Sequence, residues 1–179
     1  MQKDIDKYFM QIALKEAYKA YNKNEIPVGA VIVSNGKIIS KGHNKKEKYK
    51  NPTNHAEIIA IKKAVKKIDD WRLNNCEIYI TKEPCIMCAG AILEARFKRV
   101  IFGFKDNEKG GFGGKINLLD FFNDKIIIDS GIFEKETKSI FEKFFKKIRR
   151  GGWADESACL ESRWASFLLR GFESHPLRH

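Results

Sequence analysis

The chain has 179 residues, of which 43% are hydrophobic, and it carries 34 basic side chains of lysine and arginine against 23 acidic ones. This length predicts one domain of ordinary size, and the hydrophobic fraction excludes a chain that is disordered throughout. Four cysteines are too few for a secreted disulfide scaffold, and no apolar run approaches the roughly 18 residues of a membrane-spanning helix. Residues 1–15 interleave charges with single hydrophobic residues, unlike a signal peptide, so we expect a cytoplasmic protein with no membrane partner.

The net charge of +11 is unevenly distributed. Residues 1–150 hold 31 basic and 19 acidic residues, a balance of +12, whereas residues 151–179 have three arginines, four acids and no lysine. Residues 1–150 form the body of the chain, and their strong positive charge favours a polyanionic partner such as nucleic acid. A solvated lysine-rich surface is the competing interpretation. The change in composition predicts a domain over 1–150 and an atypical tail over 151–179.

We interpret the tail as a cloning-derived or read-through extension. The alternative is an apolar helical stripe that binds a partner or packs on the body. That stripe would consist of Trp164, Phe167, Leu168 and Phe172.

The first half of the body predicts a helix, a hairpin and a second helix. Asp4 or Asp6 caps a helix that reaches about Tyr21, and residues 28–33 form a buried strand. Asn35-Gly36 is a strong hairpin signal, so residues 37–42 return antiparallel. A polar loop with Pro52 follows, and then residues 55–68 show a helical apolar pattern.

The second half alternates strands and helices. Strands are predicted over residues 76–81, 99–104 and 125–129, and helices over 85–96, with Pro84 in the first turn, and over 133–150. This order predicts an α/β fold with a mixed five-stranded sheet, an N-terminal β-hairpin and helices on both faces. Cys76 is expected to be a buried strand cysteine, and Cys159 an incidental thiol of the tail.

A glycine-rich loop spans residues 110–114. A phosphate-binding loop would need glycine where Lys109 stands and serine or threonine where Ile116 stands. We therefore predict a flexible connection beside a site, and no nucleotide cradle.

Three potential metal ligands and one acid stand at predicted helix starts: His55, Glu57, Cys85 and Cys88. Two cysteines three residues apart at a helix N-terminus, together with one imidazole, supply three ligands for zinc and leave its fourth position to water. Such an open site is typical of catalytic zinc, whereas structural zinc sites are closed by four protein ligands. A redox Cys-x-x-Cys pair is the competing interpretation, but it assigns no role to His55 or Glu57. Taken singly, His55 is also compatible with a capping histidine and Glu57 with an ordinary first-turn acid.

The pattern His-x-Glu followed by Pro-Cys-x-x-Cys resembles the signature of zinc-dependent nucleobase deaminases. Zinc lowers the pKa of its bound water to about 7, so hydroxide is available to attack the amine-bearing carbon of an aromatic base. Glu57, near the metal without binding it, would take the water proton and pass it to the ring nitrogen and then to the departing ammonia.

The resemblance extends to the bacterial tRNA-specific adenosine deaminases over about residues 3–150. It is carried by EIPVGAV at residues 25–31, GHN at 42–44, NPTNHAE at 51–57, TKEPCIMCAGA at 81–91 and RVIFG at 99–103. It implies a three-layer α/β/α fold of the cytidine-deaminase type, a homodimer, one Zn²⁺ per chain held by His55, Cys85 and Cys88, and Glu57 as the proton shuttle. The implied reaction is the hydrolytic conversion of adenosine to inosine at the wobble position of a tRNA anticodon.

The same resemblance implies further contacts. Asn44 would hydrogen-bond the purine, Ala56 would offer its backbone to the base, Val28 would form the pocket wall, and Asp106 would meet a nucleotide ribose. The closing helix would place basic residues near the RNA backbone: Lys146, Lys147, Arg149 and Arg150. Two alternatives stay open, a deaminase of a free base or nucleoside of the guanine or cytosine type, and a non-catalytic zinc-containing module that only binds RNA.

Overall fold

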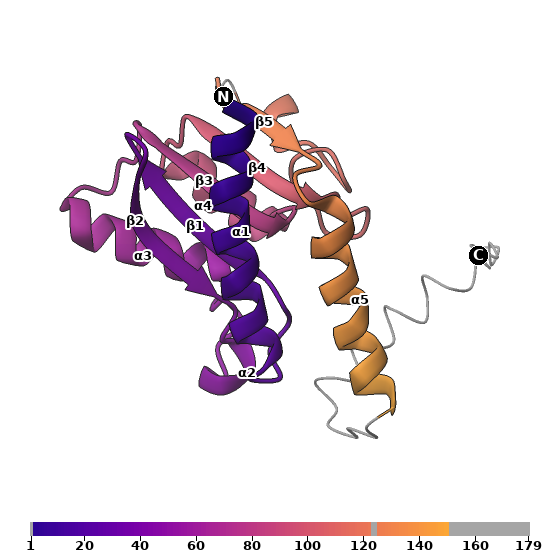
Figure 1. The fold of residues 1–179 in the computed structure, drawn as a ribbon. Helices are drawn as coiled ribbons and strands as arrows, with labels where there is room; N and C mark the ends of the chain where they lie inside the picture. Colours follow the sequence, from indigo (N-terminus) through magenta and orange to yellow (C-terminus); the bar gives the residue numbers. More distant parts are fainter. Residues whose placement is uncertain (1, 123–124, 151–179) are drawn as a thin grey trace, which may run out of the picture. The chain divides into compact units, whose positions relative to one another are not determined.

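The computed structural model describes residues 2–122 and 125–150, which form one mixed sheet with helices (Figure 1). The strand order is β2-β1-β3-β4-β5. The strands are β1 (Gly29–Ser34), β2 (Lys37–His43), β3 (Cys76–Lys82), β4 (Arg99–Phe104) and β5 (Ile127–Ser130). The helices are α1 (Gln2–Tyr21), α2 (Lys46–Tyr49), α3 (Ala56–Ile68), α4 (Ile86–Glu94) and α5 (Glu134–Arg150), with a 3-10 turn, η1 (Leu118–Asp120). The predicted five-stranded α/β fold is confirmed.

The sheet is antiparallel at one side and parallel at the other. β1 pairs antiparallel with both β2 and β3, whereas β3 with β4 and β4 with β5 are parallel pairs. The β1–β2 turn places both Asn35 and Gly36 at positive φ, 49° and 71°, as a two-residue hairpin turn requires. Because β3 and β4 run in the same direction, the segments that follow Lys82 and Phe104 leave the same edge of the sheet.

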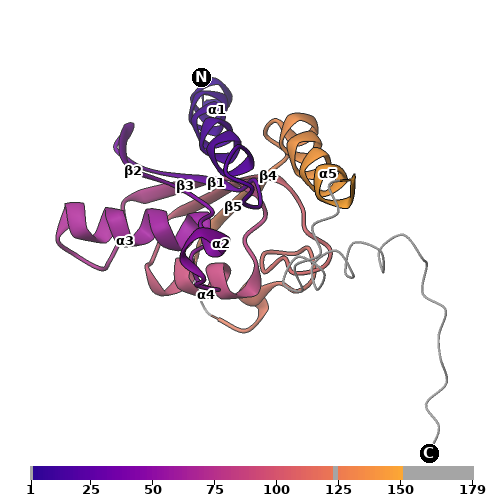
Figure 2. The same ribbon diagram turned by 90° about the horizontal axis from the view of Figure 1, so that it is seen from below.

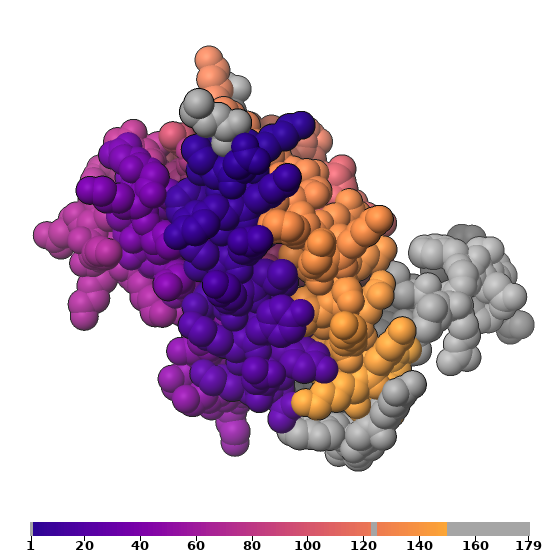
Figure 3. All heavy atoms as spheres, in the orientation of Figure 1, coloured from indigo at the N-terminus to yellow at the C-terminus, as the bar shows by residue number. Residues whose placement is uncertain are grey.

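Helices cover both faces of the sheet, which makes three layers. In Figure 2, α1 lies on one face of the sheet and α3 and α4 lie on the other. The α1 side is closed by an apolar cluster that includes Phe9, Met10, Val31, Tyr79 and Ile101, and side chains of α1 cover that face in Figure 3. On the opposite side, short residues of α3 and α4 allow close packing on the strands: Ala56, Ala60, Ala64 and Ala89 are all buried. The metal ligands predicted from the sequence and Glu57 stand at the starts of these two helices.

Several boundaries differ from those predicted. α2 and η1 were not predicted, because they are too short to show an apolar periodicity in the sequence. β5 begins at Ile127, two residues later than predicted, and α4 begins after Cys85 as its N-cap, so Pro84 precedes the first turn. Helix ends depend on capping contacts that periodicity does not report.

The chain divides into two compact units between Phe141 and Glu142. The division predicted at residue 151 lies outside the described residues, as do the tail stripe of Trp164, Phe167, Leu168 and Phe172 and the thiol of Cys159. Cys76 is 2% exposed, as predicted for a strand cysteine. Within the described ranges, every helix is too short or too polar to cross a bilayer.

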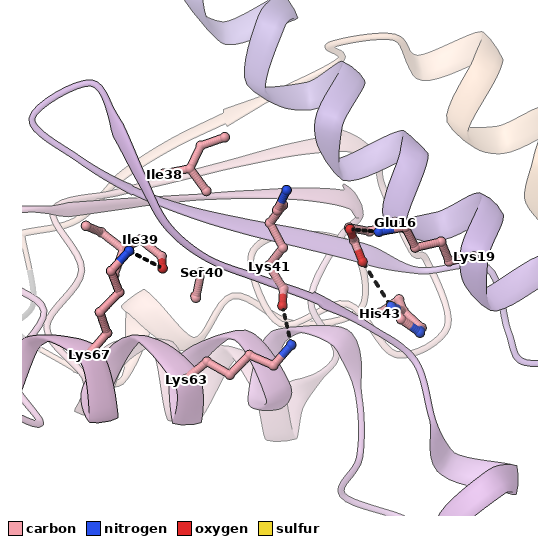
Figure 4. Close-up of a pocket in the computed structure, with 9 residues that line it drawn as sticks. All are labelled: Glu16, Lys19, Ile38, Ile39, Ser40, Lys41, His43, Lys63 and Lys67. Carbon is pink, nitrogen blue, oxygen red and sulfur yellow. Dashed lines mark hydrogen bonds and ion pairs between the residues drawn. The ribbon is translucent and has the colours of Figure 1, made fainter.

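The outer edge of β2 is blocked by lysines of α3. Lys63 donates to the carbonyl of Lys41 at 2.8 Å and Lys67 to that of Ile39 at 3.3 Å, along a groove of 690 Å³ shown in Figure 4. At its far end Glu16 pairs with Lys19 at 2.6 Å and with His43 at 2.9 Å. Charged side chains over an edge strand hinder pairing with another chain, so these lysines protect the sheet.

A buried ion pair ties α1 to β4. Arg99 donates two hydrogen bonds of 2.8 Å to the two carboxylate oxygens of Asp6, which is 3% exposed. Tyr79 and Gln2 donate to the same carboxylate at 2.8 and 3.0 Å. Burial alone raises the pKa of Asp6, but the hydrogen bonds from Arg99, Tyr79 and Gln2 outweigh it and hold that pKa below its usual value.

We expect this pair to make stability depend on acid. Because the pKa of Asp6 is lower in the folded chain than in the unfolded one, its contribution is complete above about pH 4 and is lost as the pH falls through the folded value. Asp6→Ala should lower the free energy of unfolding by about 2 kcal/mol at pH 7, since the half-buried Arg99 loses two charged hydrogen bonds and keeps Asp129, at 2.7 Å, as its remaining close partner. Urea titrations between pH 7 and pH 2 check this: the difference from wild type should shrink in acid, and a difference that is constant with pH would contradict the assignment. Asp70→Ala, in an exposed pair with Arg72, should change stability by no more than about 0.5 kcal/mol.

Candidate active site

Three side chains that could hold a metal ion meet where α3 and α4 begin. His55 is the N-cap of α3, Cys85 is the N-cap of α4, and Cys88 lies one turn further along α4. The Nδ1 atom of His55 lies 3.6 Å from Sγ of Cys85 and 3.5 Å from Sγ of Cys88. All three ligand atoms lie within 4.8 Å of one another, and they are the one such group among residues 2–122 and 125–150.

The donor set and its spacing fit zinc. Zn–S bonds of about 2.3 Å and Zn–N bonds of about 2.0 Å at tetrahedral angles separate sulfur and nitrogen by about 3.5 Å. The two sulfur–nitrogen distances in this structure match that separation. Three protein ligands of this kind would leave one tetrahedral position for a water molecule.

The cluster is electrostatically coupled. Hydrogen bonding from Cys88, and then from His55, lowers the pKa of Cys85 to about 4 despite burial. The hydrogen bond between His55 and Cys85 in turn raises the pKa of His55. The hydrogen bond between Cys88 and Cys85, together with burial, raises the pKa of Cys88. The thiolate form of Cys85 is therefore favoured in this cluster, and the thiolate is the form of cysteine that binds a metal.

Glu57 lies beside the three ligands as the second residue of α3. It is 3% exposed, and burial raises the pKa of its carboxyl. The charge of this carboxyl and its hydrogen bond with Cys88 contribute to raising the pKa of the Cys88 thiol. Its Oε2 atom is buried with no hydrogen-bond partner in the described part of the chain. A buried carboxyl oxygen without a partner is costly to keep, which indicates that a proton-bearing ligand completes this site.

Close packing of α3 on β2 brings the predicted pocket residues to the same end of the sheet. A Cβ atom at Gly42 would lie 2.3 Å from the carbonyl oxygen of Ala56, so glycine is required for this approach. Asn44, which is 3% exposed, follows directly after β2, and its backbone N–H donates to the carbonyl of Val28 at 3.2 Å. Asn44, Val28 and Ala56 thus converge near the start of α3.

Asp106 is held by the protein itself. Its carboxylate pairs with Lys82 and also accepts from the backbone N–H of Glu108 at 3.0 Å. Burial raises its pKa, but the charge and hydrogen bond of Lys82 outweigh this and hold the pKa below its usual value. Its contact with a ribose stays a prediction.

The basic residues of the closing helix are exposed. Lys146, Lys147 and Arg149 lie at the surface of α5, whereas Phe144 is buried. The side chain of Arg150 lies outside the described residues. All four belong to the second unit, and their contact with RNA stays a prediction.

Sequence reasoning missed two buried acids that organise this region. Glu25 accepts from the backbone N–H groups of Glu47 and Lys48 at 3.1 and 2.8 Å and so caps α2. Glu83 accepts the backbone N–H groups of Phe112 and Gly114 in the glycine-rich loop and that of Asp106 before it. The loop is therefore held by hydrogen bonds to a buried side chain, and the prediction of a flexible connection is wrong. The available signal was an acid directly before Ile-Pro at Glu25 and directly before Pro-Cys at Glu83.

Residues 3–104 match the model of the cytidine and deoxycytidylate deaminase zinc-binding region. The fold and the His-Cys-Cys cluster agree with this class of zinc-binding deaminases.

More specific relatives share nearly the whole body. A tRNA-specific adenosine deaminase of Aquifex aeolicus is 44% identical over 144 residues, which span 79% of this chain and 95% of that protein. One of Bacillus subtilis is 41% identical over 147 residues, spanning 81% of this chain and 91% of its own. A solved structure from work on A-to-I editing by tRNA:A34 deaminases at the wobble position of transfer RNA has a TM-score of 0.69 and 35% identity, and covers 74% of this chain and 98% of that one. This chain belongs to the tRNA-specific adenosine deaminase family.

Proposed function

We propose that this protein is a zinc-dependent hydrolase that converts adenosine to inosine at the wobble position of a tRNA anticodon. Family membership supports the reaction and its tRNA substrate. The observation that carries the mechanism is a buried, unpartnered Glu57 oxygen beside a three-ligand cluster that fits zinc.

His55, Cys85 and Cys88 would hold one zinc ion per chain. When bound, zinc supplies Lewis acidity that lowers the pKa of a water molecule to about 7. The thiolates are stabilised by their position at the first turn of α4, where the helix dipole favours negative charge.

Glu57 would move the protons of the reaction. Its Oε2 takes a proton from the attacking water, delivers it to the purine ring nitrogen, and then assists proton delivery to the departing amine. One water is consumed, the bond between C6 and its amine nitrogen breaks, and ammonia leaves as inosine forms. Burial, which raises the pKa of Glu57, suits a carboxyl that must hold a proton between these transfers.

Four residues would bind the flipped-out nucleotide. Asn44 hydrogen-bonds the purine, the backbone of Ala56 contacts the base, Val28 forms the wall, and Asp106 approaches the ribose. An anticodon loop is unpaired, so exposing its first base costs less than it would in a duplex. Four basic residues of α5 would neutralise RNA phosphates and add salt-dependent affinity: Lys146, Lys147, Arg149 and Arg150.

The protein would act in the cytoplasm as a homodimer. Ile86 and Met87, 45% and 39% exposed on the first turn of α4, support an apolar contact between subunits close to the metal ligands. Residues 1–150 would be the catalytic domain, and residues 151–179 an extension outside it.

The test is an RNA assay with a zinc count. The zinc-loaded chain is incubated with an anticodon stem-loop that carries adenosine at the wobble position, and inosine is quantified by nucleoside analysis. We expect inosine from this RNA, no product from the same RNA with guanosine at that position, and about one zinc per chain.

Free guanine and cytosine are assayed in parallel. Turnover of either base with no inosine in the stem-loop would overturn the tRNA proposal in favour of a free-base deaminase. Zinc and RNA binding with no turnover of any substrate would favour a non-catalytic module.

A further inference from the structure

A single buried carboxylate holds the loop between β4 and η1. Glu83, 1% exposed, accepts from the backbone N–H of Asp106 at 2.7 Å through Oε2. Its Oε1 accepts from Phe112 and Gly114, both at 2.9 Å. Three hydrogen bonds to one charged acceptor are strong, and they replace the solvation that this buried carboxylate loses.

The glycines of the loop are explained by this carboxylate. A Cβ atom at Gly110 would lie 2.4 Å from Cδ of Glu83, and one at Gly114 would lie 2.3 Å from Oε2. Only glycine lets the backbone come this close. The Gly110–Gly114 segment is therefore shaped to wrap an acid of its own chain.

The wrapped loop also pairs with the start of α4. The backbone N–H of Ile86 donates to the carbonyl of Lys109 at 3.1 Å, and that of Gly111 donates to the carbonyl of Pro84 at 2.9 Å. Cys85 and Gly110 form an antiparallel bridge between these two bonds. The backbone position of Cys85 thus depends on the loop that Glu83 holds.

The other end of the loop carries Asp106. Its backbone is bound by Glu83, and its carboxylate is bound by Lys82, the residue before Glu83. One side chain therefore fixes both the turn that contains Cys85 and the loop residue Asp106.

We propose that Glu83 is a positioning residue with two separable effects. Its Oε1 side holds the loop against Pro84–Ile86 and so sets the position of Cys85 for zinc. Its Oε2 side holds Asp106 and so sets the affinity for the nucleotide. The kinetic part rests on the proposed function, whereas the structural and zinc-binding parts do not.

Two variants separate these effects. In Glu83→Gln the amide oxygen keeps the bonds from Phe112 and Gly114, but the amide nitrogen faces the N–H of Asp106 and repels it. Glu83→Ala removes all three acceptors. Glu94→Gln changes an exposed acid at the end of α4, the helix that follows Glu83, and is the control.

We would measure three properties of each variant: hydrogen exchange of single amides, zinc competition with a chelator, and steady-state kinetics on the stem-loop. In Glu83→Gln we expect exchange of the Asp106 amide to rise at least about 10-fold while Phe112 and Gly114 stay protected. Its zinc affinity should stay at the wild-type value and its KM should rise about 10-fold with kcat nearly unchanged. In Glu83→Ala all three amides should exchange faster and zinc affinity should fall at least about 10-fold.

Unchanged exchange at Asp106 in Glu83→Gln would overturn the proposal, even if Glu83→Ala does not fold. Faster exchange with wild-type zinc affinity in Glu83→Ala, or with wild-type KM in Glu83→Gln, would reduce Glu83 to a structural residue and also overturn it. If the wild-type chain forms no inosine, the proposed function fails, and hydrogen exchange with zinc competition still decides the role of Glu83.

Discussion

Glu57→Gln is expected to lower the rate of inosine formation by about 10² to 10⁴-fold while zinc stays bound. The amide has nearly the volume of the carboxyl, so the buried position stays filled, but it cannot accept and return a proton at neutral pH. Because Glu57 is not among the three side chains that meet at the metal site, the zinc content should equal that of wild type. Single-turnover assays on the stem-loop and zinc emission measurements check both statements.

Glu94→Gln serves as the control for this change, because it neutralises an exposed acid on the neighbouring helix. It should leave the rate within about twofold of wild type. Wild-type activity in Glu57→Gln would remove the proton-transfer mechanism. Loss of zinc together with activity would instead indicate that Glu57 is a ligand.

Cys85→Ala is expected to reduce bound zinc below about one tenth of the wild-type value and to abolish detectable inosine formation. The two proposed ligands that remain, His55 and Cys88, would hold zinc far less tightly than three. The fold should persist, since the core on this side of the sheet is built from apolar side chains of the strands and of α3 and α4. Zinc per chain and the far-ultraviolet circular dichroism spectrum measure the two effects.

Cys76→Ala is the matched control, because Cys76 is a buried cysteine of β3 outside the cluster. It should keep zinc and activity while losing a modest amount of stability through its small cavity. Full zinc occupancy in Cys85→Ala would contradict the ligand assignment and restore the redox interpretation of Cys85 and Cys88.

The two active-site changes also separate chemistry from metal binding. Glu57→Gln should lose only the first, whereas Cys85→Ala should lose both. Retention of stem-loop binding by both variants would show that RNA affinity is carried by other residues, such as the basic positions of α5.

Local signals in the sequence were sufficient for most elements and for the chemistry-bearing residues. The Asn35-Gly36 turn, the apolar periodicity of residues 55–68 and the strands over 76–81 and 99–104 depend on neighbours a few positions away. The identities of His55, Cys85 and Cys88 also point to zinc by their chemistry. These features need no knowledge of distant contacts.

Local signals could not show that His55 meets Cys85, which is 30 positions away. They also could not show that the glycine-rich loop wraps around Glu83. Both arise because β1 pairs with β2 and β3, and β3 with β4, which brings the ends of separate segments to one edge of the sheet. The glycines at 110–114 look flexible when read along the chain, yet in three dimensions they make room for a buried carboxylate. Burial and hydrogen bonding between distant residues set these positions, and such contacts leave no periodic signal in the order of amino acids.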